Sequence, residues 1–380
     1  MTIGVGVIGF GWMGQVHTRS YLRVPQHYSD APPVELVAVA DDVPGRASAA
    51  AARYGFGAAT LDWRDLLDDS RIHAVSITLP NFLHREVGSA FAAAGKHIWI
   101  EKPVGLRADD AGAIAGAGQV AVGQVAVGFN YRNAPAVEKA RELLARHRIG
   151  NVTHARFRLL SDYAAHPEAA LSWRFERERG GNGVLGDLGS HGVDLIRYLL
   201  GEIDAVVADT AIFLPARPRP AAATAGHERG SGEPGPVEND DWLGALLRLT
   251  SGARVTLEAS RVAVAEQNNY GFEIHGTTGA LFWDFRRMGE LGVSIGPSYQ
   301  DESVRTVFAG PRDGEFGSFQ PGAGIPMSYD DLKVIEAYRF LRSIADGRPH
   351  GATLDDAIRS AEALDAMERS VASGGWVHLR

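Results

Sequence analysis

The first third of the chain alternates short apolar runs with segments of helical periodicity. Buried strands are predicted at 3–9, 34–41, 74–79, 97–101 and 124–130. Helices are predicted at 14–24, 47–54, 62–67, 85–94 and 109–116. Apolar strands separated by helices are typical of repeated β-α-β units, so this α/β region is expected to form a doubly wound parallel sheet.

The pattern changes after about residue 130. Half-buried strands, with alternating apolar and polar positions, are predicted at 151–161, 205–213, 242–249, 254–262, 269–276, 279–284 and 292–295. Helices are predicted at 135–146, 183–200, 329–345 and 354–372. We therefore expect one domain at 1–127 and a second, α+β domain with an open antiparallel sheet at 128–380.

Two segments lack periodicity. Residues 215–239 are rich in Pro, Gly and Ala, and we expect a mobile, exposed loop there because such a composition buries little apolar surface. Residues 310–327 are rich in Gly and Pro but include Phe316, Phe319 and Ile325. That segment is expected to be an ordered arm or a lid over a site.

Composition narrows the class of protein. The chain has 380 residues, of which 45% are hydrophobic and 22% charged, which is typical of soluble globular proteins. It has no cysteine, which excludes disulfides, thiolate nucleophiles and cysteine-ligated metals. A net charge of −8 argues against nucleic-acid binding. No secretory signal and no sufficiently apolar membrane span is visible, so we expect a cytoplasmic location with no membrane association.

A glycine-rich turn follows the first predicted strand. Gly9-Phe10-Gly11-Trp12-Met13-Gly14 has the pattern G-x-G-x-x-G between a strand and a helix. The first glycine permits a tight turn, the second lets a pyrophosphate approach the backbone, and the third allows the helix to pack closely on the strand. The helix N-terminus then offers N–H groups to phosphate oxygens. The segment is predicted to bind a dinucleotide.

An acidic residue ends the second predicted strand. Asp41 is expected to accept hydrogen bonds from the adenosine ribose hydroxyls and to repel a 2′-phosphate, which favours NAD. Arg46 lies close enough in sequence to meet a 2′-phosphate, so NADP stays open as the alternative. Asp41 could also be an ordinary solvated acid at a strand end, and the neighbouring Asp42 weakens its assignment.

Two further segments bear candidate chemistry. Glu101-Lys102-Pro103 follows a strand whose carboxyl end faces the expected ligand crevice, where Lys102 would polarise a substrate oxygen. Pro103 fixes that turn and is a candidate for a cis peptide bond. Asp187 and His191 stand four residues apart on a predicted helix, which suits a carboxylate that orients a general base. Asp187 could instead cap the helix, and Asp187, His191 and Asp194 could bind a metal by spacing alone.

These segments together resemble the glucose–fructose oxidoreductase/inositol dehydrogenase (Gfo/Idh/MocA) family over essentially the full chain. The matching pieces are GFGWMG (9–14), LPNFLH (79–84), AGKHIWIEKP (94–103), GFNYR (128–132) and GGNGVLGDLGSHGVDL (180–195). One departure is Leu79, where the family often has threonine. The resemblance implies a Rossmann domain, no metal, and NAD(P)-dependent oxidation of a sugar or polyol hydroxyl.

The resemblance also implies roles for individual residues. Lys102, Asp187 and His191 would form the catalytic set, and the same three residues would contact substrate. Cofactor contacts are expected from the glycine loop and from Asp41, Arg46, Leu79, Asn81, His84, Glu101, Lys102 and Asn130. A narrower resemblance to sugar dehydrogenases of the levoglucosan dehydrogenase type adds Tyr131 and Trp173 as sugar contacts. Family members commonly form homodimers or homotetramers through the open face of the second sheet.

The expected function is hydride transfer between a nicotinamide cofactor and a secondary hydroxyl of a sugar, anhydrosugar or inositol-type polyol. Two alternatives remain at this point. One is a non-catalytic sensor of nucleotide or sugar, against which the intact set Lys102, Asp187 and His191 argues. The other is a glycosidase that works by NAD-mediated oxidation, elimination and reduction.

Overall fold

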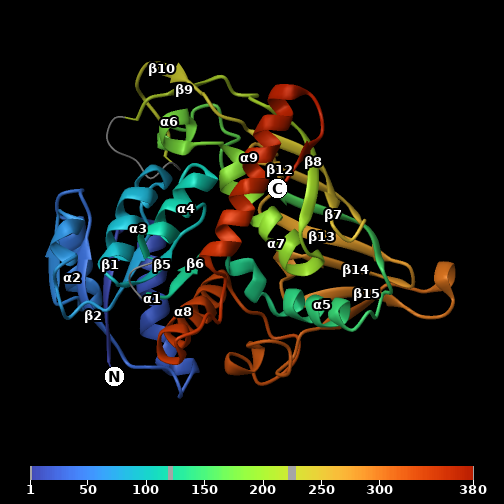
Figure 1. Ribbon diagram of the computed structural model, residues 1–380, viewed down its shortest axis with the longest axis horizontal. Coiled ribbons are helices and arrows are strands. Elements are labelled where there is room, and N and C mark those ends of the chain that lie inside the picture. Colours follow the sequence, from blue (N-terminus) through green and yellow to red (C-terminus); the bar gives the residue numbers. More distant parts are fainter. Residues whose placement is uncertain (1, 119–122, 221–227, 380) are drawn as a thin grey trace. The chain divides into compact units, whose positions relative to one another are not determined.

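The computed structural model describes residues 2–118, 123–220 and 228–379, which form two compact units (Figure 1). The first unit combines Met1–Asn130 with Ser328–Arg359, and the second combines Tyr131–Met327 with Ser360–Arg380. Each unit is built around one large sheet.

The first unit contains a six-stranded parallel sheet. Its strands are β1 (Ile3–Ile8), β2 (Val34–Ala40), β3 (Ala58–Thr60), β4 (Ala74–Ile77), β5 (His97–Ile100) and β6 (Val125–Val127). They follow the order β3-β2-β1-β4-β5-β6, and every pair is parallel. This is the doubly wound order of a dinucleotide-binding fold, which confirms the predicted Rossmann sheet. The short strand β3 was not predicted from the sequence.

Five helices of the first unit accompany this sheet. They are α1 (Trp12–His27), α2 (Arg46–Tyr54), α3 (His84–Ala93), α4 (Ala108–Ala117) and α8 (Tyr329–Asp346). The predicted helix at 62–67 is the 3-10 turn η1 (Trp63–Leu66), and η2 (Asn81–Leu83) precedes α3. Strands β1 and β4 are buried along their whole lengths, as expected for a sheet covered on both faces.

Helix α8 belongs to the first unit, whereas the sequence pattern grouped residues 328–359 with the second domain. Ion pairs between Arg19 and Asp330 and between Arg23 and Asp331 join α8 to α1. The apolar face of α8, including Leu332 and Ile335, is buried. Helix α9 (Leu354–Ser373) starts in the first unit and continues into the second.

The second unit contains a nine-stranded sheet in the order β16-β15-β14-β13-β7-β12-β11-β8-β17. The strands are β7 (Val152–Leu160), β8 (Ile203–Ala211), β11 (Trp242–Leu249), β12 (Arg254–Ser260), β13 (Asn269–Gly276), β14 (Gly279–Asp284), β15 (Glu290–Ile295), β16 (Arg305–Phe308) and β17 (Val377–His378). Neighbours are antiparallel apart from the parallel pair β7 and β12. The expected antiparallel sheet is thus mixed at one pair, and β16 and β17 were not predicted.

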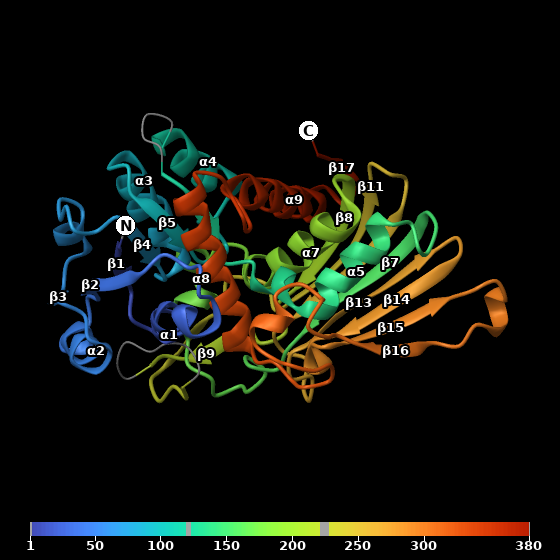
Figure 2. The same ribbon diagram turned by 90° about the horizontal axis from the view of Figure 1, so that it is seen from below.

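Helices α5 (Pro135–Ala145) and α7 (Ser190–Leu200) lie on one face of this sheet (Figures 1 and 2). Gly192 makes close packing possible, because a Cβ there would lie 2.6 Å from a methyl carbon of Leu257. On β12, alternate residues such as Thr256 and Glu258 are exposed, so the face opposite these helices carries polar side chains.

The described parts of the segment 215–239 are largely exposed, as predicted, but they are not irregular throughout. Residues 216–218 and 234–236 form the antiparallel strands β9 (Ala216–Pro218) and β10 (Pro234–Pro236). Arg217 is fully buried, with its guanidinium 4.3 Å from the ring centre of Phe175 and its Nη2 donating to the carbonyl oxygen of Ala164. A cation–π contact and carbonyl acceptors permit this burial. Residues 221–227 lie outside the described part of the chain.

The segment 310–327 packs within the second unit. It contains the 3-10 turn η9 (Phe316–Ser318), and Phe316 is buried. Asp313 pairs with Lys139 of α5, with 3.0 Å between the carboxylate oxygen and Nζ. These contacts match the expectation of an ordered arm at 310–327.

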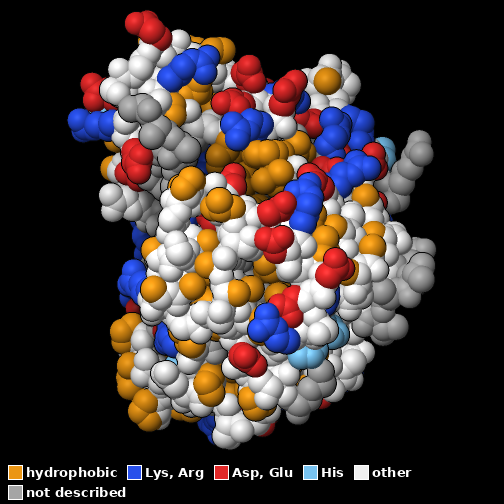
Figure 3. Space-filling view, turned by 90° about the vertical axis from the view of Figure 1, so that its left-hand side faces the viewer, with side chains coloured by type: hydrophobic (Ala, Val, Ile, Leu, Met, Phe, Trp, Pro, Cys, Tyr) orange, Lys and Arg blue, Asp and Glu red, His pale blue; other side chains and the backbone are white. Residues whose placement is uncertain are grey.

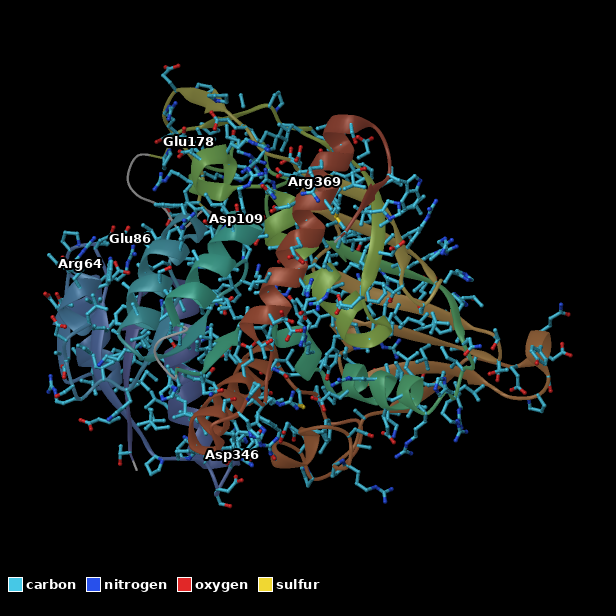
Figure 4. All side chains as sticks on the ribbon, in the orientation of Figure 1. Arg64, Glu86, Asp109, Glu178, Asp346 and Arg369 are labelled. Atoms are coloured by element: carbon cyan, nitrogen blue, oxygen red, sulfur yellow. The ribbon has the colours of Figure 1, made fainter. Side chains whose placement is uncertain are left out.

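Acidic and basic side chains are interspersed on the face drawn in Figure 3. On the first unit, Arg64 and Glu86 form an exposed ion pair with 2.7 Å between Nη2 and Oε1 (Figure 4). Among the described residues, no helix combines the length and hydrophobicity needed to cross a bilayer.

Candidate active site

The glycine loop joins β1 to α1 with the geometry that its three glycines predict. Gly9 has a φ of 81°, and its N–H donates to the carbonyl oxygen of Ala40 at 2.8 Å. A Cβ on Gly14 would lie 2.2 Å from the carbonyl oxygen of Gly9, so only glycine permits this approach of α1 to β1. The hydroxyl of Thr78, at the end of β4, donates to the same carbonyl at 2.5 Å.

The space beside the second glycine suits a pyrophosphate. A Cβ on Gly11 would meet no described atom within 4 Å. Gly11 is also the N-cap of α1 and supplies no capping side chain, so the helix begins with N–H groups that need an acceptor. Phosphate oxygens meet that need. Trp12, 60% exposed, and Met13 follow in the first turn, where the Trp12 ring stacks on Tyr329 of α8.

Asp41 follows β2 and connects that strand to the glycine loop. Its Oδ2 accepts from the N–H of Phe10 at 2.6 Å, and its Oδ1 accepts from the N–H of Val43 at 2.9 Å. Arg46 lies 3.2 Å from Oδ1. A buried carboxylate held at this position favours a ribose with free hydroxyls over one with a 2′-phosphate.

The loop after β5 presents Lys102. The peptide bond between Lys102 and Pro103 is cis, and Lys102 is half-buried. His84 fixes this loop from α3: its Nδ1 lies 2.8 Å from the carbonyl oxygen of Pro103, and its Nε2 lies 2.9 Å from that of Leu79. Burial lowers the pKa of His84, while its bonds to these two carbonyl oxygens raise it. His84 therefore connects two loops of the predicted cofactor side.

Glu101 is almost completely buried. Its Oε1 lies 2.9 Å from Nε2 of His17 on α1 and 2.5 Å from Nζ of Lys333 on α8. Its Oε2 accepts from the backbone N–H of Lys102 at 3.3 Å. Burial raises the pKa of Glu101, but the Lys333 ammonium and the bond from His17 lower it well below its usual range. Glu101 is thus an ionised anchor for the loop that carries Lys102.

The side-chain amide of Asn130 in the first unit lacks hydrogen-bond partners among the described residues. Its side chain is fully buried, and neither amide atom has a hydrogen-bond partner among the described residues. Buried amides are nearly always paired, so such a pair of atoms points to a ligand. Asn81 and Leu79 are half-buried in the loop after β4. The first unit as a whole therefore fits a bound dinucleotide.

Asp187 and His191 lie at the junction of two helix types in the second unit. Leu185–Gly189 is a π-helical turn, η6, in which the N–H of Ser190 reaches the carbonyl oxygen of Leu185. It runs directly into α7, which begins at Ser190. The sequence predicted one continuous helix over 183–200. The wider turn separates Asp187 from the regular part of α7, and such insertions are frequent at functional sites.

A tyrosine that the sequence analysis missed contacts Asp187. The Tyr163 hydroxyl donates to Oδ2 of Asp187 at 2.5 Å. Burial and the negative charge of Asp187 raise the pKa of Tyr163 well above its usual value. Tyr163 therefore remains a neutral donor at any working pH. Asp187 is half-buried and His191 is buried.

The Tyr131 ring lies against His191 and against two further aromatic rings. The Tyr131 ring centre lies 4.6 Å from that of His191, 5.6 Å from Tyr270 and 5.0 Å from Phe285. Trp173 lies in the 3-10 turn η5 (Trp173–Phe175), where the Arg174 guanidinium is 4.4 Å from its ring centre. Tyr131 and His191 are therefore neighbours, as a shared sugar site requires.

Asp194, which a metal site could have used, forms a different interaction. It pairs with Arg132 in two buried contacts, from Nε to Oδ2 at 2.8 Å and from Nη2 to Oδ1 at 2.5 Å. Among the described residues, no group of three or more His, Cys, Asp or Glu is arranged to hold a metal ion. The structure thus assigns Asp194 to fixing the segment that contains Tyr131.

Known protein families match both units. The model of the oxidoreductase family with an NAD-binding Rossmann fold matches residues 3–129, and that of the GFO/IDH/MocA C-terminal domain matches residues 137–282. Levoglucosan dehydrogenase of Pseudarthrobacter phenanthrenivorans is 37% identical over 99% of this chain and 98% of that protein. Inositol 2-dehydrogenase of Rhizobium meliloti is 27% identical over 98% of both chains.

Solved structures agree with these sequence matches. Levoglucosan dehydrogenase in complex with NADH and levoglucosan superposes with a TM-score of 0.93 at 35% identity, over 100% of both chains. An NAD-binding oxidoreductase from Klebsiella pneumoniae gives a TM-score of 0.92 at 33% identity, again over 100% of both chains. The similarity therefore extends through both units.

Proposed function

The chain belongs to the GFO/IDH/MocA oxidoreductase family, and from this premise we propose that it is an NAD-dependent dehydrogenase of a sugar, anhydrosugar or inositol-type polyol. The observation that carries the proposal is the setting of His191, which lies beside Tyr131 and shortly after the π-turn with Asp187. An imidazole can take up the proton of a substrate hydroxyl, and an aromatic ring beside it can pack against the apolar face of a sugar. Neither the sensor nor the glycosidase has comparable support.

The proposed mechanism assigns proton transfer, charge stabilisation and substrate contact to different residues. Bound NAD supplies the hydride acceptor. His191 takes the proton of the substrate hydroxyl on an imidazole nitrogen, and Asp187 stabilises the resulting imidazolium. Lys102 stabilises the negative charge that develops on the substrate oxygen. Tyr131 and Trp173 contact the apolar face of the sugar.

Cofactor binding falls to the first unit. Gly9–Gly14 would hold the pyrophosphate, Asp41 would face the adenosine ribose, and Asn130 would use its unmet amide atoms. Arg46 pairs with Asp41, which supports NAD over NADP. Leu79, Asn81 and His84 line or brace the same region.

A direct assay tests the function. Purified protein is mixed with NAD or NADP and with levoglucosan, glucose, xylose, myo-inositol or scyllo-inositol, and reduced nicotinamide is followed by absorbance. We expect saturable NAD reduction with a member of this panel, with the anhydrosugar favoured by the similarity to levoglucosan dehydrogenase. No reduction by any sugar or polyol, with NAD binding intact by calorimetry, would contradict the proposal.

We further propose a cytoplasmic homodimer or homotetramer. The sheet face opposite α5 and α7 exposes Leu246, at 48%, and the half-exposed Trp242 and Phe282. Such side chains suit contact with a second copy. Light scattering should give two or four times the chain mass of 40.7 kDa, and Leu246→Glu should lower it. A mass of one chain would contradict this assembly.

A further inference from the structure

Lysine is rare in this chain. The sequence contains only Lys96, Lys102, Lys139 and Lys333, and the other basic residues among its 38 are arginines. Lys96 donates to two backbone carbonyl oxygens, and Lys139 pairs with Asp313. An ammonium is a compact charge with three donors, which suits sites too small for a guanidinium. The side chain of Lys333 is fully buried.

Lys333 connects α8 to the loop that carries the proposed catalytic lysine. Its Nζ lies 2.5 Å from Oε1 of Glu101 and 2.8 Å from Oε2 of Glu336. The other oxygen of Glu101 accepts from the backbone N–H of Lys102. One buried carboxylate thus links the Lys333 ammonium to the backbone of Lys102.

A chain of hydrogen bonds reaches the same carboxylate from α1. Burial lowers the pKa of His17 to about 4 against the raising effect of Glu101, so the ring is neutral at pH 7. Its Nε2–H then donates to Glu101, while Nδ1 accepts from the Ser76 hydroxyl at 3.1 Å. Ser76 in turn accepts from the hydroxyl of Tyr21 at 3.0 Å. In this series of hydrogen bonds, from Tyr21 through Ser76 and His17, each group donates in the direction of Glu101.

The Glu101 carboxylate and its partner His17 are closely packed. A Cβ on Gly128 would lie 2.7 Å from Oε1 of Glu101. The His17 ring stacks on Trp99, with 3.5 Å between ring centres. We therefore expect a change in the partners of Glu101 to be felt in the loop that it anchors.

We propose that Lys333 is a positioning residue for Lys102 and acts through the Glu101 carboxylate. The inference rests on the proposed function, in which Lys102 stabilises charge on the substrate oxygen. Without the ammonium, Glu101 would hold an uncompensated charge or take up a proton, and the bond to the Lys102 N–H would weaken.

Kinetics of Lys333→Met give the first test. We expect kcat to fall about 10- to 100-fold and the KM for NAD to change less than about threefold, because displacement of a catalytic group affects the chemical step. Arg23→Met is the matched control, since it breaks a different ion pair of α8, the one between Asp331 and Arg23 of α1. It should leave kcat within about twofold of the unmodified chain. Equal kcat in Lys333→Met and the unmodified chain would overturn the proposal.

A double-mutant cycle separates positioning from a general loss of structure. Glu101→Gln and the double variant Lys333→Met/Glu101→Gln both remove the buried carboxylate at position 101, whereas Glu336 loses its ammonium partner in both variants that contain Lys333→Met. If Lys333 acts through Glu101, adding Lys333→Met to Glu101→Gln should lower kcat by less than about twofold. A further tenfold loss would overturn the proposal, even if the single variant Lys333→Met does not fold.

The pH profile adds a readout that a merely structural role would not move. The charged and titratable groups around Glu101 are His17, His84, Lys102, Tyr329, Lys333 and Glu336. Loss of the Lys333 charge should raise the pKa of Glu101 and add an acid limb to kcat, with activity falling as Glu101 takes up a proton. Lys333→Met/Glu101→Gln should lack this limb. An identical profile in both variants would contradict the proposal.

A measurement on the free protein needs no substrate. Lysine labelled with ¹³C at Cε should give four NMR signals, which Lys→Arg variants assign. In Lys333→Met the Lys102 signal should shift while the Lys139 signal stays in place. An unmoved Lys102 signal would overturn the inference. If the unmodified chain oxidises no polyol but the Lys102 signal shifts, the proposed function fails and the coupling stands.

Discussion

Two carboxylates, Glu101 in the first unit and Asp187 in the second, adjoin the proposed catalytic groups and have opposite kinds of partner. Glu101 is buried against the ammonium of Lys333, and its pKa stays well below its usual range. Asp187 accepts instead from the Tyr163 hydroxyl, a neutral donor whose pKa is raised. Glu101 thus has an ammonium among its partners, and Asp187 has a neutral phenol among its own.

This difference separates anchoring from catalysis. The charge of Glu101 is balanced within the fold, so the residue can hold a loop but has little charge left to offer a reacting group. Tyr163 is a neutral donor, so this bond itself does not cancel the charge of Asp187, which in the proposed mechanism stabilises a protonated His191. Substitutions in the two clusters should therefore differ in what they damage.

The largest expected effect lies in the second unit. His191→Asn should lower kcat about 10³-fold, because it removes the proposed general base. NAD affinity by calorimetry should stay within about threefold, since the glycine loop belongs to the first unit. Undiminished turnover by this variant would contradict the assignment.

In the first unit we expect the stability of the fold to decrease at acid pH, because the buried His17 resists protonation. His17 has a pKa of about 4 when folded, against 6.5 for an unperturbed histidine, so the unfolded chain binds the proton first as pH falls. The contribution of His17 to the free energy of unfolding is complete above pH 6.5. It declines as the pH falls from 6.5 and is lost below about 4, and the total loss is about 3 kcal/mol.

Urea unfolding at pH 7 and pH 5 tests this contribution. The free energy of unfolding should fall less between the two pH values in His17→Gln than in the unmodified chain, because the amide still donates to Glu101 but does not titrate. The same fall in both proteins would show that His17 is not the group responsible.

A smaller effect should follow from Tyr163→Phe, which leaves Asp187 without its phenol donor. We expect kcat to fall about 10-fold and stability to fall by about 1–2 kcal/mol. Tyr338→Phe is the matched control, because Tyr338 also donates to a carboxylate, that of Asp30, at 3.0 Å. The account fails here if the two variants have the same kcat.

The last prediction concerns cofactor choice and leaves the chemical step intact. Asp41→Ala should reduce the preference for NAD over NADP by about 10-fold, because Arg46 loses its partner and can meet a 2′-phosphate. The neighbouring Asp42 is exposed, so Asp42→Ala should leave the ratio of kcat/KM values unchanged. Equal ratios in the two variants would remove Asp41 from this role.

The parts of the molecule that are local in sequence were predictable. The glycine loop and the strands beside it follow from a six-residue pattern and from apolar runs, and the structure has them within a few residues of the prediction. The similarity of whole segments to a known family added the two-unit architecture. The family match and the strand orders of the two sheets confirm the Rossmann fold and the presence of a second sheet unit.

The supporting contacts were not predictable, because their partners are remote in the chain. Lys333 lies 232 positions from Glu101, and Tyr163 lies 24 positions from Asp187. His17 looked like one histidine among 13, although its place beside the glycine loop was a usable signal. The π-turn at Leu185–Gly189 was also hidden, since its glycines are equally compatible with a regular helix.

The central claim is that His191 takes the proton while NAD accepts the hydride. The most direct test is the rate of NADH formation in a single turnover with the best substrate of the panel, measured across pH for the unmodified chain and His191→Asn. The account predicts a fast rate that falls as pH falls in the unmodified chain, and a slow, nearly flat profile in the variant. A variant that retains the rate and pH profile of the unmodified chain would contradict it.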